Sequence, residues 1–439
     1  MSPQRRDVLK GLGGVAAMAA FGKLGAQVTG VSAPAEPNGQ PGQAPTFPRK
    51  ADFEIEAGYT YINAAYTHPM PRVATDAVQR YVDGRRALRA PATGGGRGAG
   101  GGGAASNAPR ADPKALFAEL INAKPTEIAY VPNTSTGENL VVNGLGLERK
   151  FVGNVVTDGL HYDGALVHLL ELKRQGLDVR VVRPNKEFRI AMSDLEKAID
   201  KNTKLVEVSS TAMYNGFQHD LKAVCDVAHA NGAYVYADII HSAGAEPFDV
   251  RASGVDFAAC SSFKWLMGDF GLGFLYAKED LLERVIARSQ IGYYQLSSMS
   301  GHFPPFDPRE AEAPVSWAFR KDATGSFEIG TIGGSIAAGL GASLGYVKQL
   351  GVANIQAHRQ PLLKKLRAEV PRFGFTPVTP PESTAGVITF AKENVGSSGL
   401  PQKLQAARVN VRFSTHWMRL SPSVYNDLAD VDRFLEALS

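Results

Sequence analysis

Lys264 is the residue of this chain whose type and surroundings most favour chemistry. It lies in a short polar turn within residues 255–276, after a predicted buried strand and before a glycine-rich return into a second apolar strand. A solvated, protonated lysine is a weak nucleophile, but desolvation by Phe263, Trp265 and Leu266 would lower its pKa and make the amine reactive. The alternative is an ordinary surface lysine in a loop, so the hypothesis needs a second residue.

Asp238 is that second residue. It ends a predicted strand, Ala233–Asp238, that comes one strand before the lysine turn. An aspartate at a strand end is in many proteins no more than a helix cap. In pyridoxal 5'-phosphate (PLP) enzymes, however, a lysine holds the cofactor aldehyde as a Schiff base and an aspartate pairs with the pyridinium nitrogen. A strand-end aspartate followed by a serine-flanked lysine therefore indicates PLP as the cofactor.

Three further motifs extend this pattern along the chain. They are YINAA at Tyr61–Ala65, FEIGT at Phe327–Thr331 and RLSPSVYN at Arg419–Asn426. From about Tyr59 to the C-terminus, their order resembles the class V aminotransferase family of fold type I PLP enzymes. That family includes cysteine desulfurases, kynureninases and isopenicillin N epimerases. The resemblance implies an α/β enzyme with PLP at the carboxyl ends of its strands.

The resemblance also implies a role for each candidate residue. Lys264 would carry PLP and act as the base, Asp238 would keep the ring nitrogen protonated, and His161 would stack on the ring. The other expected cofactor contacts are Thr134, Ser135, Ser261, Ser262 and the partner subunit's Thr331 at the phosphate, and His241 at the phenolic oxygen. Arg419 would bind the substrate carboxylate, and Asn63 would lie at the substrate mouth.

Some of these residues have simpler interpretations, and some positions depart from the family pattern. Thr134 and Ser135 could form a plain helix cap rather than an anion site. A lone histidine such as His161 is more often structural. The departures are Leu160 in place of a glutamate, Met213 in place of an asparagine, and Phe263 in place of the histidine that precedes the lysine in desulfurases.

Alternation of predicted strands and helices favours an α/β fold, the fold type I of PLP-dependent transferases. We expect a large, mostly parallel-sheet domain at 51–310, whose segment 51–70 can pack with a small C-terminal α+β domain at 311–439. The 439 residues carry a net charge of +4 with no basic stripe, which argues against a nucleic-acid partner. Two cysteines cannot form a disulfide framework, and the histidine spacing predicts no metal site.

The N-terminus predicts export. Residues 1–33 contain Arg5-Arg6 and a weakly apolar run, which resemble a twin-arginine signal peptide. A Pro/Gly-rich linker follows at 34–50, and a glycine-rich surface loop is expected at 93–105. We therefore expect a periplasmic protein, loaded with PLP in the cytoplasm before the twin-arginine machinery exports it, with no stable membrane anchor after cleavage.

The reaction class stays open at this point. We expect a homodimer with shared active sites that acts on an α-amino acid, or on an amino-acid residue of a secreted peptide, through an external aldimine and a quinonoid. Lyase, aminotransferase and epimerase chemistry all remain possible. The segment Phe413–Met418 before Arg419 holds no cysteine, so we do not expect a persulfide-type cysteine desulfurase. The rival hypothesis is a catalytically silent periplasmic protein of the same fold that binds PLP or a peptide.

Overall fold

The computed structural model describes residues 45–87, 112–150, 152–301 and 315–439. The predicted signal peptide 1–33, most of the linker and the glycine-rich loop 93–105 lie outside these residues. Pro45–Ser439 form one compact unit, and the description that follows concerns this unit. The predicted domain limits within it, 51–310 and 311–439, remain predictions.

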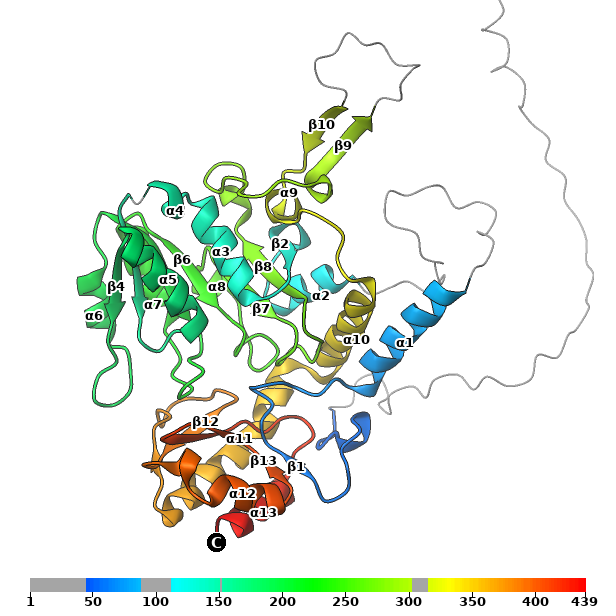
Figure 1. The fold of residues 1–439 in the computed structure, drawn as a ribbon, viewed down its shortest axis with the longest axis vertical. Helices are drawn as coiled ribbons and strands as arrows, with labels where there is room; N and C mark the ends of the chain where they lie inside the picture. The colour runs from blue at the N-terminus through cyan, green and yellow to red at the C-terminus, as the bar shows by residue number, and fades with distance from the viewer. Residues whose placement is uncertain (1–44, 88–111, 151, 302–314) are drawn as a thin grey trace, which may run out of the picture. The chain divides into compact units, whose positions relative to one another are not determined.

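A seven-stranded sheet forms the larger part of the unit (Figure 1). Six strands run in the same direction, with β6 at the centre between β5 and β7, and β8 is antiparallel to both of its neighbours. In spatial order the strands are β2 (Ile128–Val131), β8 (Gly273–Ala277), β7 (Phe257–Ser261), β6 (Tyr234–Asp238), β5 (Thr203–Ser209), β3 (Asn154–Asp158) and β4 (Asp178–Val182). The central strands are buried and apolar along their length, as strands covered on both faces must be.

Helices cover both faces of this sheet. Successive strand residues point to opposite faces, so Val155 joins the core under α3 and α5, whereas Val156 joins the core under α2, α6 and α7. The helices of this part are α2 (Pro113–Leu120), α3 (Thr134–Gly144), α4 (Leu147–Lys150), α5 (Asp163–Gln175), α6 (Met192–Ala198), α7 (Leu221–Ala230), α8 (Val250–Ser253) and α9 (Ala323–Phe327). Because the parallel strands between these two layers of helices run in one direction, their carboxyl ends lie at one edge of the sheet.

A second, four-stranded antiparallel sheet lies toward the C-terminus. Its core takes Phe390 and Met418 from the strands, Leu362 and Leu366 from α11, and Phe434 from α13. The elements are α11 (Val352–Glu369), β11 (Thr376–Pro377), β12 (Ile388–Ala391), α12 (Leu400–Ala406), β14 (Arg412–Phe413), β15 (Trp417–Leu420) and α13 (Leu428–Leu438). The short strand β1 (Thr60–Tyr61) pairs in parallel with β13 (Val409–Asn410), so the segment that begins near residue 51 adds to this part of the fold.

Two long helices and one hairpin complete the unit. α1 (Arg72–Arg86) packs along α10 (Gly334–Leu350), which continues into α11. The hairpin of β9 (Leu296–Gly301) and β10 (Val315–Phe319) stands away from both sheets in Figure 1. Among the described helices, none combines the length and the apolar composition needed to cross a membrane.

Candidate active site

A cavity of about 290 Å³ opens at the carboxyl ends of the central strands. Three of its polar residues end neighbouring strands: Ser209 ends β5, Asp238 ends β6, and Ser261 ends β7. Ser209 and Asp238 are direct partners in the sheet register. The lining residues are Asn133, Thr134, Ser135, Tyr162, Ser209, Met213, Asp238, Ile240, His241, Ser261, Phe263 and Lys264. This is the edge at which open α/β sheets bind ligands.

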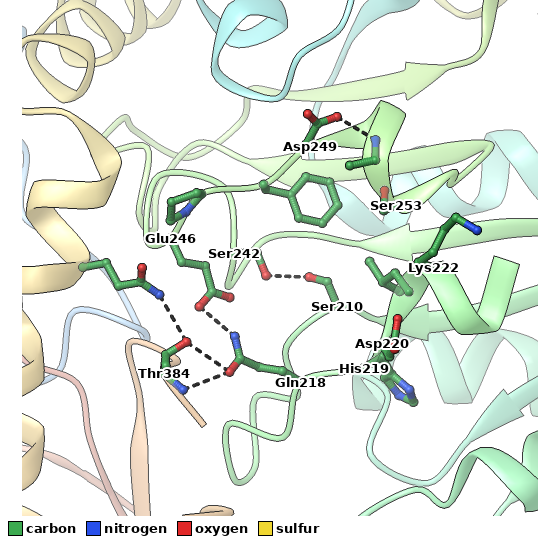
Figure 2. A pocket seen from close by; sticks show the side chains of 15 residues that line it. Ser210, Gln218, His219, Asp220, Lys222, Ser242, Glu246, Asp249, Ser253 and Thr384 are labelled. Carbon is green, nitrogen blue, oxygen red and sulfur yellow. Dashed lines mark hydrogen bonds between the residues drawn. The ribbon is translucent and has the colours of Figure 1, made fainter. Parts of the chain in front are cut away.

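A larger crevice, of about 520 Å³, holds none of the predicted site residues (Figure 2). Its buried carboxylate, Glu246, already accepts hydrogen bonds from Thr211 and from Gln218. The Gln218 side chain in turn accepts a hydrogen bond from the backbone of Thr384, next to the smaller sheet. These hydrogen bonds indicate that the crevice is a polar contact between the larger and the smaller part of the fold. We therefore place the chemistry in the smaller cavity.

Lys264 reaches into the smaller cavity from the turn after β7. Its Nζ lies 3.1 Å from Nε2 of His241. Burial lowers the pKa of Lys264 to about 8, an effect opposed by the charge of Asp238 and reinforced by that of Arg419. Burial and the same two cations, Lys264 and Arg419, lower the pKa of His241, so the imidazole is neutral. At neutral pH a usable fraction of the lysine is therefore the nucleophilic free amine.

The sequence places the lysine turn by two local devices. The Ser262 hydroxyl donates to the backbone oxygen of Leu272 at 2.7 Å and also to that of Asp269. Gly244 has a φ of +82° and comes so close to the turn that a Cβ there would lie 2.5 Å from the carbonyl oxygen of Trp265. Ser262 thus holds the turn closed, is fully buried, and does not line the cavity. The phosphate contact predicted for Ser262 is replaced by this structural role.

Replacing Gly244 by alanine is expected to destabilise the protein and displace the lysine turn. The left-handed backbone alone costs about 1–3 kcal/mol for a residue with a Cβ, and the overlap with the Trp265 carbonyl adds about 1–3 kcal/mol. Gly232→Ala is the matched control, because Gly232 has a φ of +81° but open space around it. Urea unfolding of both variants should give a larger loss for Gly244→Ala. Equal losses would show that the close approach has no energetic weight.

Asp238 lies beside the lysine with an incomplete set of partners. The side chain is 5% exposed, and Oδ1 accepts one hydrogen bond, of 3.0 Å, from the backbone of Ile240. Burial raises the pKa of Asp238, partly offset by the nearby His161. A buried carboxylate with so few donors is costly, so a protonated ring nitrogen in the cavity would stabilise its ionised form.

His161 lies behind the cavity wall rather than in it. Its ring is fully buried, Nδ1 lies 2.8 Å from the Ser209 hydroxyl, and Nε2 has no partner among the described residues. The next residue, Tyr162, is 39% exposed and does line the cavity. The turn that carries both residues is held by Asp158, which accepts a hydrogen bond from Leu160 N at 2.7 Å. Tyr162, rather than His161, is therefore the residue of this turn that lines the cavity.

The N-terminus of α3 forms the anion-binding end of the cavity. Thr134 and Ser261 interlock, since Thr134 N donates to Ser261 Oγ at 2.9 Å and Ser261 N donates to Thr134 Oγ1 at 3.1 Å. The N-cap Asn133 accepts from Thr136 N, which leaves Ser135 in the first turn at the cavity. Backbone N–H groups and the helix dipole favour an anion here. Predicted Thr134, Ser135 and Ser261 are thus brought together.

Arg419 approaches the cavity from the smaller sheet. It is 4% exposed, its Nη1 donates to the carbonyl of Met213 at 2.8 Å, and its Nε has no partner among the described residues. Burial lowers the pKa of Arg419 to about 10, with a further contribution from Arg412, so the side chain remains a cation at neutral pH. Asn63 lies nearby, because it forms a β-bridge with Ser421, and its Oδ1 has no partner within the described residues.

Thr331 is exposed and lies outside the cavity lining, and its hydroxyl contacts that of Tyr293. The lining residues that the sequence analysis did not name are Asn133, Tyr162, Ser209 and Ile240, whereas Met213 was named there as a departure from the family pattern. Ser209 could have been found, since it ends a predicted parallel strand beside Asp238. The others line the cavity by turn geometry that the sequence does not reveal.

A sequence model of the class-V aminotransferases matches residues 64–434. The chain belongs to the class-V aminotransferase family. It is therefore a PLP-dependent enzyme, and the fold is that of the type I PLP-dependent transferases, as the sequence predicted. The geometry fits the cofactor: α3 can hold the phosphate, Asp238 the ring nitrogen, and Lys264 the aldehyde.

Relatives of this class V chain include proteins named for reactions of sulfur-containing amino acids. It is 28% identical over 369 residues to a probable cysteine desulfurase of Methanothermobacter thermautotrophicus, covering 84% of this chain and 86% of that protein. The apo structure of a cysteine desulfurase from Thermococcus onnurineus NA1 matches with a TM-score of 0.74 and 24% identity, covering 90% and 98% of the two chains. A complex of the cystine C-S lyase C-DES with its product cysteine persulfide matches with a TM-score of 0.70 and 21% identity, covering 87% and 97%.

These similarities contradict the sequence prediction about function. The chain was expected not to be a persulfide-type cysteine desulfurase, yet relatives that match most of its length are named cysteine desulfurases or probable cysteine desulfurases. The prediction was wrong because it judged the reaction from one segment without a cysteine. In a PLP enzyme the lysine and the cofactor activate the amino acid, and elimination can then cleave a C–S bond without a thiol nucleophile from the enzyme.

The two thiols of this class V enzyme are both buried and free. Burial raises the pKa of Cys225 to about 12, and burial together with the charge of Asp238 also raises the pKa of Cys260. Cys225 lies on α7 and Cys260 on β7, the strand that leads to Lys264.

Capture of PLP by the cofactor-free protein is expected to speed up as the pH rises through about 8. Only the free amine of Lys264 attacks the aldehyde, and burial lowers the pKa of that amine to about 8. Stopped-flow absorbance of PLP mixed with apoprotein should therefore show a rate that rises with pH and levels off above pH 8. A midpoint near 10.5, the value of a solvated lysine, would contradict the burial argument.

Proposed function

We propose that this enzyme cleaves the C–S bond of a sulfur-containing α-amino acid of the cysteine or cystine class. The observation that carries the proposal is the similarity to cysteine desulfurases over 84% of the chain, combined with a cavity that holds Lys264, Asp238 and a helix N-terminus together. The matching structure of a cystine C-S lyase supports a fold that suits such chemistry.

The residues divide the work as follows. PLP, when bound, supplies an electron sink for the bonds at the α-carbon. Lys264 removes or returns the proton at that carbon, for which a pKa of about 8 is well matched to neutral pH. The neutral His241 accepts a hydrogen bond from the protonated lysine at 3.1 Å and keeps its Nζ aimed into the cavity. Arg419 orients the substrate carboxylate, and the sulfur leaves with the electron pair of the C–S bond.

The test is a product analysis of the purified holoenzyme with L-cysteine and L-cystine. Release of sulfide from L-cysteine or of cysteine persulfide from L-cystine, together with stoichiometric pyruvate and ammonia, would support the proposal. Serine and alanine, which have no C–S bond, serve as control substrates. Turnover of the control amino acids by transamination or epimerisation, without sulfur release from either sulfur substrate, would overturn it.

We also propose that the enzyme is a homodimer in which Thr331 serves the partner's site. Thr331 is exposed and lies away from its own cavity, and the apolar side chains of Ile291, Tyr293 and Ile329 around it are 73%, 55% and 44% exposed. A mixture of Lys264→Ala and Thr331→Ala subunits tests this proposal. In a shared site, the hybrid dimer combines an intact Lys264 with an intact Thr331, so mixing should restore PLP affinity at one site. No recovery on mixing would place Thr331 in its own subunit's site or in none.

Export by the twin-arginine route is a further proposal, supported by Arg5-Arg6 and the weakly apolar residues that follow. Replacing both arginines by lysine should retain the protein in the cytoplasm. Unchanged recovery of that variant from the periplasm would contradict a twin-arginine signal.

A further inference from the structure

Two arginines face each other on the smaller sheet. Arg412 of β14 and Arg419 of β15 are direct partners in the antiparallel register, so their side chains project from the same face. Like charges in such a pair repel each other, and Arg412 indeed contributes to lowering the pKa of Arg419. Among the residues that the structure describes, neither guanidinium group has an acidic partner. An anionic ligand would relieve this repulsion.

The two guanidinium groups occupy different depths. Arg419 is 4% exposed and donates inward, to the carbonyl of the cavity residue Met213. Arg412 is exposed, and its guanidinium carbon lies 4.9 Å from the ring centre of Tyr66, itself 52% exposed. Stacking on an aromatic ring holds an arginine in place while leaving its N–H groups free to bind a carboxylate. The pair therefore offers one buried cation and one cation on the rim.

Backbone hydrogen bonds connect the segment around Tyr66 to the turn that carries Lys264. Two residues after it, His68 N donates a 3.0 Å hydrogen bond to the carbonyl of Phe263, the residue before Lys264. Tyr66 N is itself fixed by the carbonyl of Asn63 at 3.0 Å. A short chain of backbone contacts thus connects the Tyr66–Arg412 stack to Phe263, a residue of the cavity wall. A substrate bound at Lys264 and Arg419 would extend past this stack.

We propose that Arg412, held by Tyr66, binds a second carboxylate of the substrate, and that the preferred substrate is a dicarboxylic α-amino acid whose carboxylates are linked through sulfur. This inference rests on the proposed function and names its substrate class: a disulfide or thioether of two amino-acid units rather than a monocarboxylate thiol. Arg419 binds the carboxylate next to the reacting carbon, and Arg412 binds the distant one.

Binding of two matched amino acids without sulfur tests this assignment independently of C–S cleavage. 2-Aminosuberate and 2-aminooctanoate have the same chain length and differ only in the terminal carboxylate. Titration of the holoenzyme, followed by the visible band of bound PLP, should show that 2-aminosuberate binds tighter by about tenfold or more, the value expected of a charged hydrogen-bonded pair. Arg412→Gln should abolish this preference. Equal affinities in the wild type, or an unchanged preference in Arg412→Gln, would overturn the proposal.

Control variants distinguish recognition of the second carboxylate by Arg412 from effects of the protein's net charge and of packing around Tyr66. Arg372→Gln removes the same charge from an exposed arginine that pairs with Glu369, and it should keep the preference. Tyr66→Phe keeps the stacking ring and should also keep it, whereas Tyr66→Ala should weaken it. A preference lost equally in Arg372→Gln would mean that net charge, not Arg412, recognises the ligand.

Kinetics with sulfur substrates distinguish a failure of this inference from a failure of the proposed function. If the holoenzyme releases sulfur from cystine and from S-methylcysteine, Arg412→Gln should raise KM for cystine about tenfold or more and leave that for S-methylcysteine unchanged. Equal effects on both substrates would overturn the role of Arg412 and leave C–S cleavage standing. Absence of sulfur release from both cysteine and cystine would refute the proposed function, and the titration would still decide the role of Arg412.

Discussion

Replacing Lys264 by alanine is expected to lower turnover by about 10⁴-fold, the upper range for loss of a positioned acid–base group. The variant loses both the amine that captures the PLP aldehyde and the base that faces the α-carbon. It is also expected to fold, because within the described part of the chain the side chain makes a single hydrogen bond, and that bond is to the neutral His241. The measurement is kcat for the best sulfur substrate, with circular dichroism as the check on folding.

Two controls make this result specific to Lys264. Lys197→Ala removes a lysine that is 75% exposed and pairs with Asp194, and it should leave kcat unchanged. Borohydride reduction of the wild type, followed by peptide mapping, should place the pyridoxyl group on the peptide that contains Lys264. A pyridoxyl group on another lysine would show that the assignment is wrong, whatever the activity of the variant.

The centre of this site could be predicted because a short stretch of sequence shows where a buried strand of a parallel sheet ends. A residue that ends a buried strand lies at the binding edge of an α/β sheet wherever the strand sits in the order. Asp238 and Lys264 were therefore recognisable from the strands before them, and the structure brings both to one cavity. Thr134 and Ser135 follow the same logic, since a strand and a helix N-terminus flank them.

The contacts that could not be predicted depend on side-chain orientation, which differs between residues that are adjacent in the sequence. Ser261 and Ser262 look alike in sequence, yet one faces the cavity and the other bonds the backbone of the turn. His161 and Tyr162 likewise divide between the wall and the cavity. The β9–β10 hairpin falls in a stretch with no clear period, and the contact of Tyr66 with Arg412 joins segments far apart in the chain.

Function was harder than fold for a physical reason. The lysine, the strand-end aspartate and the helix N-terminus fit PLP, and PLP alone is compatible with many reactions at the α-carbon. Which of these reactions occurs depends on the path of the leaving group. That path depends on small differences between the side chains at the cavity mouth. The segment Phe413–Met418 was read as evidence against a desulfurase, but the relatives corrected that prediction. The residues beside it, Arg412 and Arg419, carry more information on the substrate than the missing thiol does.

Replacing Arg419 by alanine is expected to lower kcat/KM for a carboxylate substrate. The expected loss of transition-state stabilisation is about 2–5 kcal/mol, the usual cost of truncating one partner of a buried charged pair. This corresponds to roughly 30- to 4000-fold. Burial lowers the pKa of Arg419 to about 10, so the guanidinium is charged throughout the neutral range. Arg419→Lys should restore little of the loss, because an ammonium group cannot bind a carboxylate through two parallel hydrogen bonds.

A carboxylate-specific comparison decides whether Arg419 acts on the substrate or only on the fold. Its Nη1 already bonds the Met213 carbonyl at 2.8 Å, so a purely structural role has a concrete basis. The measurement is kcat/KM for cystine or cysteine and for the corresponding amide, in the wild type and in Arg419→Ala. If Arg419 binds the carboxylate through its unpartnered Nε and the adjoining Nη2, the variant loses activity on the acid and little on the amide. Equal losses on both would assign Arg419 to holding the loop at Met213, because a displaced loop impairs every substrate alike.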